Sequence, residues 1–241
     1  MTYETIDVRK LTGGCGAEVL GVDLNALSNS QWGEVQRAFV EHGVVFFRDQ
    51  KLTPEQHLAF ARRWAPIDVN RFFRHVEGHP EIAEVRKEPE QKTNIGGGWH
   101  TDHSYDLEPA MGSVLLAREL PDEGGDTLFA NMYRAFETLS PGLQRTLEGM
   151  NAVHGSAHIF GRGGVNDMNP EGKSRYGNQD KVGADVVHPA VCEAGFGFRN
   201  FGNGINADAQ LPGGGRQNQT GRASNFRGVA LACTAGRFEL E

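Results

Sequence analysis

The first 65 residues alternate between apolar positions at helical spacing and a short continuous apolar run. Ser28 and Gln31 form a capping-box pattern ahead of apolar residues spaced three and four apart, and Gly43 supplies a stop. The β-favouring run Val44–Phe47 follows directly. Thr53, with a proline behind it, then begins a second helical pattern. The pattern predicts a helix, a buried strand and a second helix, in that order.

Beyond residue 66 the pattern changes to strand-sized segments separated by turn residues. Three such segments lie at 82–88, 113–117 and 126–130. One helix interrupts them, beginning at the cap Ser140 and ending at Gly149. Strands with few helices between them favour an antiparallel sheet or barrel over a doubly wound sheet. We therefore predict a mixed α/β (α+β) domain.

The last third of the chain has a different character. Residues 160–185 are polar and rich in glycine and asparagine, which predicts a long surface loop. From Glu193 onward the last 49 residues hold ten glycines and five arginines but no lysine, histidine, tryptophan or tyrosine. Neither the helical nor the strand period persists there. We predict a divergent, disordered tail over residues 192–241.

Composition narrows the class of protein. The chain has 241 residues, 24 basic against 31 acidic, a formal net charge of −7 and no long run of lysine or arginine, which argues against a nucleic-acid partner. Three cysteines without a CxxC spacing indicate a reducing compartment. No signal peptide and no apolar run long enough to cross a membrane is visible. These features predict a cytoplasmic protein with no membrane partner.

The candidate chemistry lies in the stretch GGGWHTDH. In an extended segment residues i and i+2 share a face, so His100 and Asp102 can offer an imidazole and a carboxylate to one point. These are two of the three ligands of the facial triad that holds non-haem Fe(II). His103 would face the other way and ranks below His100 as a ligand. The preceding glycines, 96–98, are either a flexible loop or a place where the backbone approaches a ligand closely.

A much longer pattern surrounds this stretch. The chain resembles the TauD/TfdA family of Fe(II)- and 2-oxoglutarate-dependent dioxygenases in blocks that occur in the family's order. They are GAEVLGVDL at 16–24, HGVVFFRDQKLTPEQHLAFARRW at 42–64, NIGGGWHTDHSYDLEPAMGSVLLARELP at 94–121, GGDTLFANMYRAFETLSPGLQ at 124–144, NAVHG at 151–155 and HPAV at 188–191.

The resemblance implies roles for individual residues. His100 and Asp102 match the family's first two iron ligands, and Thr127 matches the threonine that holds the distal carboxylate of 2-oxoglutarate. Asn94 falls where some members place an asparagine near the substrate. His75 falls where taurine-type members bind substrate, although an exposed loop histidine is an equal reading of that position.

The resemblance also implies a fold and a reaction. The fold would be a double-stranded β-helix (jelly-roll, cupin-like) with flanking helices, filled by a dioxygenase domain over residues 1–191. The cofactor would be Fe(II), with 2-oxoglutarate and O2 as cosubstrates, and a small, often anionic molecule would be hydroxylated while 2-oxoglutarate is converted to succinate and CO2. Related enzymes often form homo-oligomers.

The resemblance stops after Val191. The family's second iron-binding histidine and the arginine that pairs with 2-oxoglutarate are expected there, but the last histidine in the sequence is His188. One reading is a truncated or frame-altered inactive relative whose jelly-roll is incomplete at its C-terminal end. A second is a metal-binding barrel with different chemistry whose third ligand is His154, His158 or His188.

Overall fold

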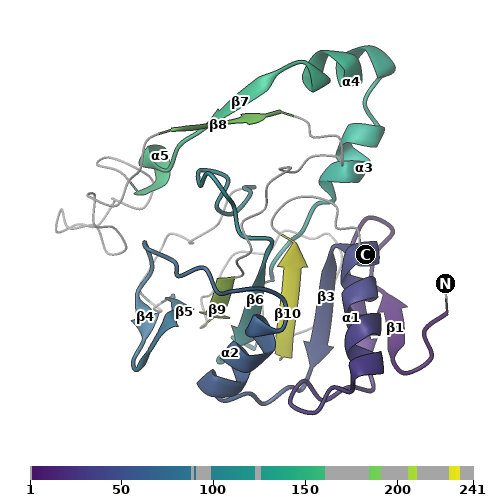
Figure 1. Ribbon diagram of the computed structural model, residues 1–241, viewed down its shortest axis with the longest axis vertical. Coiled ribbons are helices and arrows are strands. Elements are labelled where there is room, and N and C mark those ends of the chain that lie inside the picture. Colours follow the sequence, from purple (N-terminus) through teal and green to yellow (C-terminus); the bar gives the residue numbers. More distant parts are fainter. Residues whose placement is uncertain are drawn as a thin grey trace.

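The computed structural model describes residues 2–87, 90, 99–122, 126–160, 185–190, 206–210 and 228–233. Its main feature is an eight-stranded mixed sheet, whose strands lie side by side across the lower part of Figure 1. Along the sheet the order is β1 (Asp7–Lys10), β2 (Ala17–Leu20), β3 (Val44–Arg48), β10 (Gly228–Cys233), β6 (Gly112–Ala117), β9 (Asn206–Gln210), β5 (His79–Val85) and β4 (His75–Val76).

Two capped helices pack on this sheet. Helix α1 (Asn29–His42) begins at Ser28, whose side chain accepts the backbone N–H of Gln31, and ends at Gly43, which has a left-handed φ of 69°. Helix α2 (Pro54–Arg62) begins with an equivalent capping box at Thr53. Both helices and the intervening strand β3 confirm the sequence-based prediction. In Figure 1 the two helices lie over the same face of the sheet.

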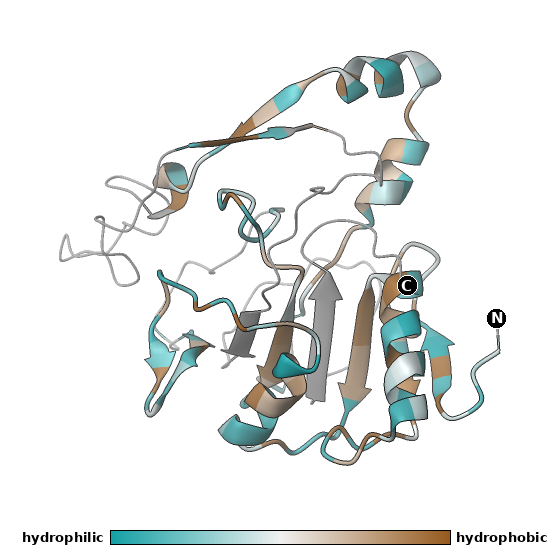
Figure 2. Cartoon of the chain, viewed as in Figure 1, coloured by the Kyte–Doolittle hydropathy of each residue, from teal (hydrophilic) through white to brown (hydrophobic). Residues whose placement is uncertain are grey.

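The core lies between these helices and the sheet. Figure 2 shows brown, hydrophobic positions on β3 and β6, and teal bands on the sides of α1 and α2 that face the viewer. Trp32 and Phe60 meet edge to face at 6.1 Å between ring centroids, and Phe39 and Trp64 meet at 5.2 Å. Phe47, from β3, is fully buried, and its ring centroid lies 6.0 Å from that of Phe60. These aromatic contacts place α1, α2 and β3 in one hydrophobic core.

A smaller arm lies beside the sheet, at the top of Figure 1. It contains α3 (Met132–Glu137), α4 (Pro141–Glu148), α5 (Ala157–Phe160) and the antiparallel pair β7 (Asn151–His154) and β8 (Val186–Pro189). Helix α4 confirms the prediction of a helix capped by Ser140. The strand predicted at 126–130 is wrong, because that segment is irregular and its side chains are mostly exposed.

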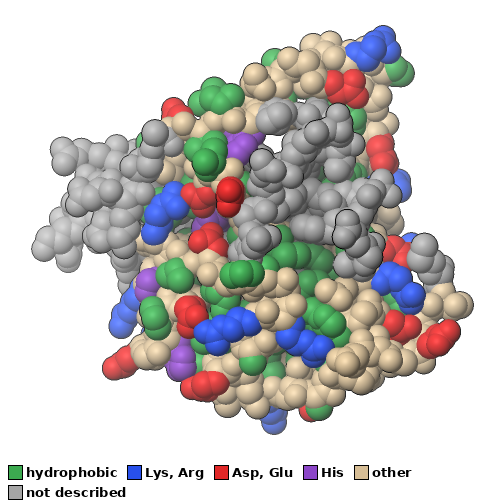
Figure 3. Space-filling view, in the orientation of Figure 1, with side chains coloured by type: hydrophobic (Ala, Val, Ile, Leu, Met, Phe, Trp, Pro, Cys, Tyr) green, Lys and Arg blue, Asp and Glu red, His purple; other side chains and the backbone are tan. Residues whose placement is uncertain are grey.

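Figure 3 shows green hydrophobic side chains at the surface of the arm. The exposed hydrophobic residues there are Met132, Leu143, Met150, Val153 and Val187. Neither α3 nor α4 buries a residue completely. Hydrogen bonds nevertheless join the arm to the rest of the molecule: Asn131, the cap of α3, donates from Nδ2 to the carbonyl of Gly14 at 2.8 Å.

Two short strands come from the C-terminal fifth of the chain. Strand β10 pairs antiparallel with β3 and β6, and β9 runs parallel to β5 and β6. The interior of the loop predicted at 160–185, and the rest of the tail, lie outside the described residues. In the part of the chain that is described, no helix is long and apolar enough to cross a membrane.

Candidate functional site

His100 and Asp102 face each other at the surface. The Nε2 atom of His100 lies 3.2 Å from Oδ1 of Asp102, and the side chains are 49% and 47% exposed. The segment is not a strand, because residues 99–101 are irregular and a turn begins at Asp102. The pair therefore does not lie in a β-strand, although its two side chains do meet.

The spacing of the two donor atoms suits a metal ion. Two donors bound at about 2.1 Å and at right angles to one ion lie about 3 Å apart. The His100–Asp102 pair meets that separation, and an imidazole with a carboxylate is the ligand chemistry of a non-haem Fe(II) site. These two residues therefore fit as two adjacent ligands of such an ion.

The surroundings keep the Asp102 carboxylate ionised. Desolvation raises its pKa, but the hydrogen bond from His100 and the nearby charges of His100 and His103 outweigh it, so the pKa is lowered overall. An ionised carboxylate is the form that binds a cation. The Asp102 carboxylate is thus in that form at neutral pH.

His103 follows Asp102 directly in the sequence and is buried. The residue is only 5% exposed, and its backbone has a left-handed φ of 56°. Nδ1 lies 2.8 Å from Oδ2 of Asp106, and Nε2 lies 3.2 Å from Nδ2 of Asn70. Sequence reasoning passed over this histidine because it was judged only as a ligand.

The hydrogen bonds of Asn70 fix the proton on this imidazole. Its Oδ1 accepts the backbone N–H groups of Phe72 at 2.9 Å and Phe73 at 3.1 Å, so Nδ2 is the atom that faces His103. Because Nδ2 is a donor, Nε2 of His103 must accept. The proton of the neutral ring therefore lies on Nδ1 and is donated to Asp106.

An arginine completes this buried network. Arg71 forms an ion pair with Oδ1 of Asp106 at 2.7 Å, and its guanidinium lies over the rings of Phe72 and Tyr105, at 4.8 and 5.5 Å from the ring centroids. Burial raises the pKa of Asp106, but its hydrogen bonds to His103 and Arg71 prevail and lower it. We call His103, Asp106, Asn70 and Arg71 the turn brace.

A second grouping of ligand atoms overlaps the brace. Atoms of Asp68, His103 and Asp106 lie within 4.8 Å of one another, the one such group among the described residues. Both ring nitrogens of His103 already have hydrogen-bond contacts, and Arg71 already neutralises Asp106. A cation would have to displace these contacts, so the geometry favours a hydrogen-bonded network over a metal site.

The other predicted site residues are not joined to the pair. Thr127 is exposed in the irregular segment before α3, and no hydrogen bond links it to His100 or Asp102 in the described part of the chain. His75 lies at β4, where Nε2 donates to the carbonyl of Asn70 at 2.9 Å. Asn94 and the glycines at 96–98 lie outside the described residues.

The candidate third ligands are in the arm. His154 and His188 come from the paired strands β7 and β8, and their ring centroids are 5.7 Å apart. The Nε2 atom of His188 lies 3.0 Å from the backbone carbonyl of Asp106. His158 is in α5. Within the described residues no group of three ligand atoms joins any of them to His100 and Asp102.

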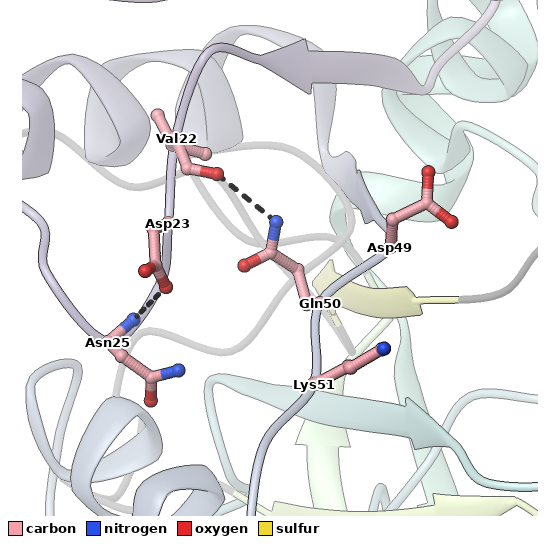
Figure 4. Close-up of a pocket in the computed structure, with 6 residues that line it drawn as sticks. All are labelled: Val22, Asp23, Asn25, Asp49, Gln50 and Lys51. Atoms are coloured by element: carbon pink, nitrogen blue, oxygen red, sulfur yellow. Dashed lines mark hydrogen bonds between the residues drawn. The ribbon is translucent and has the colours of Figure 1, made fainter.

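A separate surface pocket of about 320 Å³ lies between the ends of β2 and β3 (Figure 4). It is lined by Val22, Asp23, Asn25, Asp49, Gln50 and Lys51. Gln50 donates to the carbonyl of Val22 at 3.1 Å, and Asp23 accepts the backbone N–H of Asn25 at 2.9 Å. These bonds stabilise the two turns, and Lys51 balances part of the acidic charge.

Comparison with known proteins identifies the class. The family model of the taurine catabolism dioxygenase TauD, TfdA family, matches residues 7–219, well past the point where the recognisable blocks end. The chain belongs to the TauD/TfdA family. Enzymes of this family use Fe(II), 2-oxoglutarate and O2.

Individual relatives agree with this family. A sulfonate dioxygenase of Saccharomyces cerevisiae that depends on alpha-ketoglutarate, which is 2-oxoglutarate, is 32% identical over 162 residues, or 63% of this chain and 39% of its own length. An (S)-phenoxypropionate/alpha-ketoglutarate-dioxygenase of Sphingobium herbicidovorans is 34% identical over 61% of this chain and 53% of its own. The chain thus spans about half, or less, of the length of these relatives.

Solved structures give the same result. The crystal structure of a taurine dioxygenase from Burkholderia xenovorans is similar with a TM-score of 0.55 and 36% identity, covering 63% of this chain and 54% of that one. AAD-2, solved in complex with Mn(II) and N-oxalylglycine, is similar with a TM-score of 0.54 and 26% identity, covering 77% and 63%.

Proposed function

We propose that this protein is an Fe(II)- and 2-oxoglutarate-dependent dioxygenase that hydroxylates a small organic anion. The observation that carries the proposal is the 3.2 Å approach of His100 Nε2 to Asp102 Oδ1 within a family-matched segment. The core would be the double-stranded β-helix of the family, with α1 and α2 outside it.

The chain's own residues have limited and definable tasks. His100 and Asp102 would hold the metal, and the hydroxyl of Thr127 would donate to the distal carboxylate of 2-oxoglutarate. When bound, Fe(II) supplies the activation of O2 that couples decarboxylation of 2-oxoglutarate to oxidation of a C–H bond. The protein contributes ligation, orientation and exclusion of side reactions.

The relatives suggest the substrate class. Their names refer to sulfonates and phenoxypropionate, and further relatives are named as an alkylsulfatase and a 2,4-dichlorophenoxyacetate dioxygenase. A sulfonate, a carboxylate and a sulfate ester share one negative charge on a small organic body. We therefore propose that this chain accepts a molecule of that kind, with His75 and Asn94 as candidate contacts.

A second candidate is an inactive relative that binds metal weakly. The observation that favours it is the sequence itself, in which no histidine follows His188, where the family's third ligand is expected. Two ligands alone would hold Fe(II) poorly, and 2-oxoglutarate would lack the bidentate charge-assisted pairing of an arginine.

Turnover assays separate the two candidates. The purified chain would be supplied with Fe(II), ascorbate, 2-oxoglutarate and O2, with an alkylsulfonate, a phenoxycarboxylate or an alkyl sulfate. The dioxygenase proposal expects succinate in an amount that rises with one of the substrates and that is lost in His100→Ala. No succinate above the His100→Ala background with any of the three would support the inactive relative.

A further inference from the structure

We infer that His103 is a positioning residue: held by Asp106 and Asn70, it fixes the turn that starts at Asp102 and so sets the Asp102 carboxylate against His100. The inference rests on the proposed metal site and assigns it a supporting group. His103 itself donates no ligand atom, since both of its ring nitrogens already have hydrogen-bond contacts.

The backbone of His103 has an unusual conformation. A φ of 56° is unusual for a residue with a side chain and persists only when the surroundings hold it. This residue follows Asp102 directly, so its backbone angles set the direction in which the turn leaves the metal-binding pair. The backbone N–H of Asp106 closes the same turn by donating to the carbonyl of His103 at 2.9 Å.

The turn brace connects two segments that are far apart in the sequence. Its side chains join two segments that are 33 residues apart, the irregular stretch at 70–73 and the turn at 103–106. Asn70 is itself fixed by two backbone N–H groups and by His75, so it is a rigid anchor. Phe72 and Tyr105 pack edge to face at 5.7 Å across the same join. These contacts thus fasten the turn at 103–106 to the stretch at 70–73.

His103 places a polar side chain at a buried position. An apolar side chain at position 103 could fill the space, but dispersion contacts do not define one orientation. Two hydrogen bonds, with their donor and acceptor order set by Asn70, allow one ring orientation. Hydrogen-bonded groups outside the ligand set are the means by which proteins orient metal ligands.

The test measures metal affinity and folding separately. Co(II) binding to the full chain would be followed by its visible absorption, and stability by thermal unfolding without metal. His103→Leu removes both hydrogen bonds and should weaken Co(II) binding by about 10- to 100-fold, the usual effect of losing a group that orients a ligand. His103→Gln, which can still donate to Asp106 and accept from Asn70, should recover most of the affinity.

Two control variants keep the outcome interpretable. Ser28→Ala removes the cap of α1 and lowers stability away from the site. Asp106→Asn keeps an acceptor for His103 but weakens the ion pair with Arg71, and it should lower the affinity by a smaller factor than His103→Leu.

Specific results would overturn either the inference about His103 or the proposed metal site. If His103→Leu binds Co(II) within twofold of the original chain, or loses no more affinity than Ser28→Ala at the same loss of stability, the inference is wrong. If His103→Leu does not fold, the Asp106→Asn result decides: unchanged affinity overturns the inference. If His100→Ala binds Co(II) as well as the original chain, the proposed metal site fails instead.

Discussion

His188 donates from Nε2 to the backbone carbonyl of Asp106 at 3.0 Å, across 82 residues of sequence. This bond joins strand β8 of the arm to the turn behind the metal-binding pair. The carbonyl oxygen can only accept, so Nε2 of His188 carries a proton in this contact. We therefore predict that His188, one of the candidate third ligands, has a structural role.

Replacing His188 by alanine tests that assignment. Because the side-chain contacts of Asp106 remain, we expect the Co(II) affinity to change by less than threefold. The melting temperature should fall, since the loss of one largely buried hydrogen bond costs about 1 kcal/mol. Metal titration together with thermal unfolding checks both effects. A tenfold loss of affinity would restore His188 as a ligand.

Thr127 offers a test of cosubstrate binding. Thr127→Val removes the hydroxyl but keeps the shape, and we expect the Kd for 2-oxoglutarate to rise about fivefold to tenfold, the equivalent of one hydrogen bond of roughly 1 kcal/mol. Co(II) affinity should not change. Thr127→Ser, which keeps the hydroxyl, is the matched control. Equal 2-oxoglutarate affinity in all three chains would remove Thr127 from the site.

His57 makes the fold sensitive to acid. It is fully buried in α2, where Nε2 donates to the carbonyl of Val114 at 3.0 Å and Nδ1 has no hydrogen-bond partner among the described residues. Burial lowers its pKa from 6.5 to about 4, against the hydrogen bond to Val114. The unfolded chain therefore takes up a proton first, and stability falls as the pH drops from about 6.5 to about 4.

His57→Gln should remove this dependence. Glutamine can still donate to Val114 but does not titrate. Across that pH range the original chain should lose about 3 kcal/mol more unfolding free energy than the variant, from the size of the pKa shift. Urea unfolding at a series of pH values measures the difference. Identical pH profiles would mean that the buried imidazole is protonated without cost.

Glu34 fastens the N-terminal segment to α1. Its carboxylate accepts the backbone N–H groups of Glu4, Thr5 and Ile6 at 2.7, 2.8 and 3.1 Å, and the hydroxyl of Thr5 at 2.7 Å. Burial raises its pKa, but these four donors prevail and lower it to about 2. The stabilisation is therefore complete above pH 4.5 and is lost as the pH falls toward 2.

Glu34→Gln should lower the free energy of unfolding by about 1–3 kcal/mol at pH 7, because an amide cannot accept from all four donors. Hydrogen exchange of the amides at 4–6 should become faster. Glu41→Gln is the matched control, because Glu41 accepts one exposed hydrogen bond, from Tyr3. An equal effect of both substitutions would contradict this account of Glu34.

Locally determined features were predictable from the sequence. The starts of α1 and α2 depend on capping boxes at Ser28 and Thr53, whose partners are three residues away, and both were found. The segment at 126–130 has strand-favouring residues, but it pairs with no strand in the described part of the chain, so its composition led to a wrong prediction. Helix α3 was missed, although Asn131 caps it by accepting the N–H of Arg134.

The candidate site was predictable only in part. The His100–Asp102 pair could be proposed from spacing and resemblance, because its members are two residues apart. The turn brace could not, since Asn70 and His103 meet through folding and nothing in their local sequence marks the contact. The left-handed backbone of His103 likewise depends on its tertiary contacts rather than on its residue type.

The most direct test of the central claim is an anaerobic titration of the chain with Fe(II), followed by 2-oxoglutarate. If His100 and Asp102 hold the metal with positions open for the cosubstrate, a metal-to-ligand charge-transfer absorption should appear, and His100→Ala and Asp102→Ala should abolish it. A folded chain that gives no such absorption, or one that gives it equally in both variants, would contradict the account.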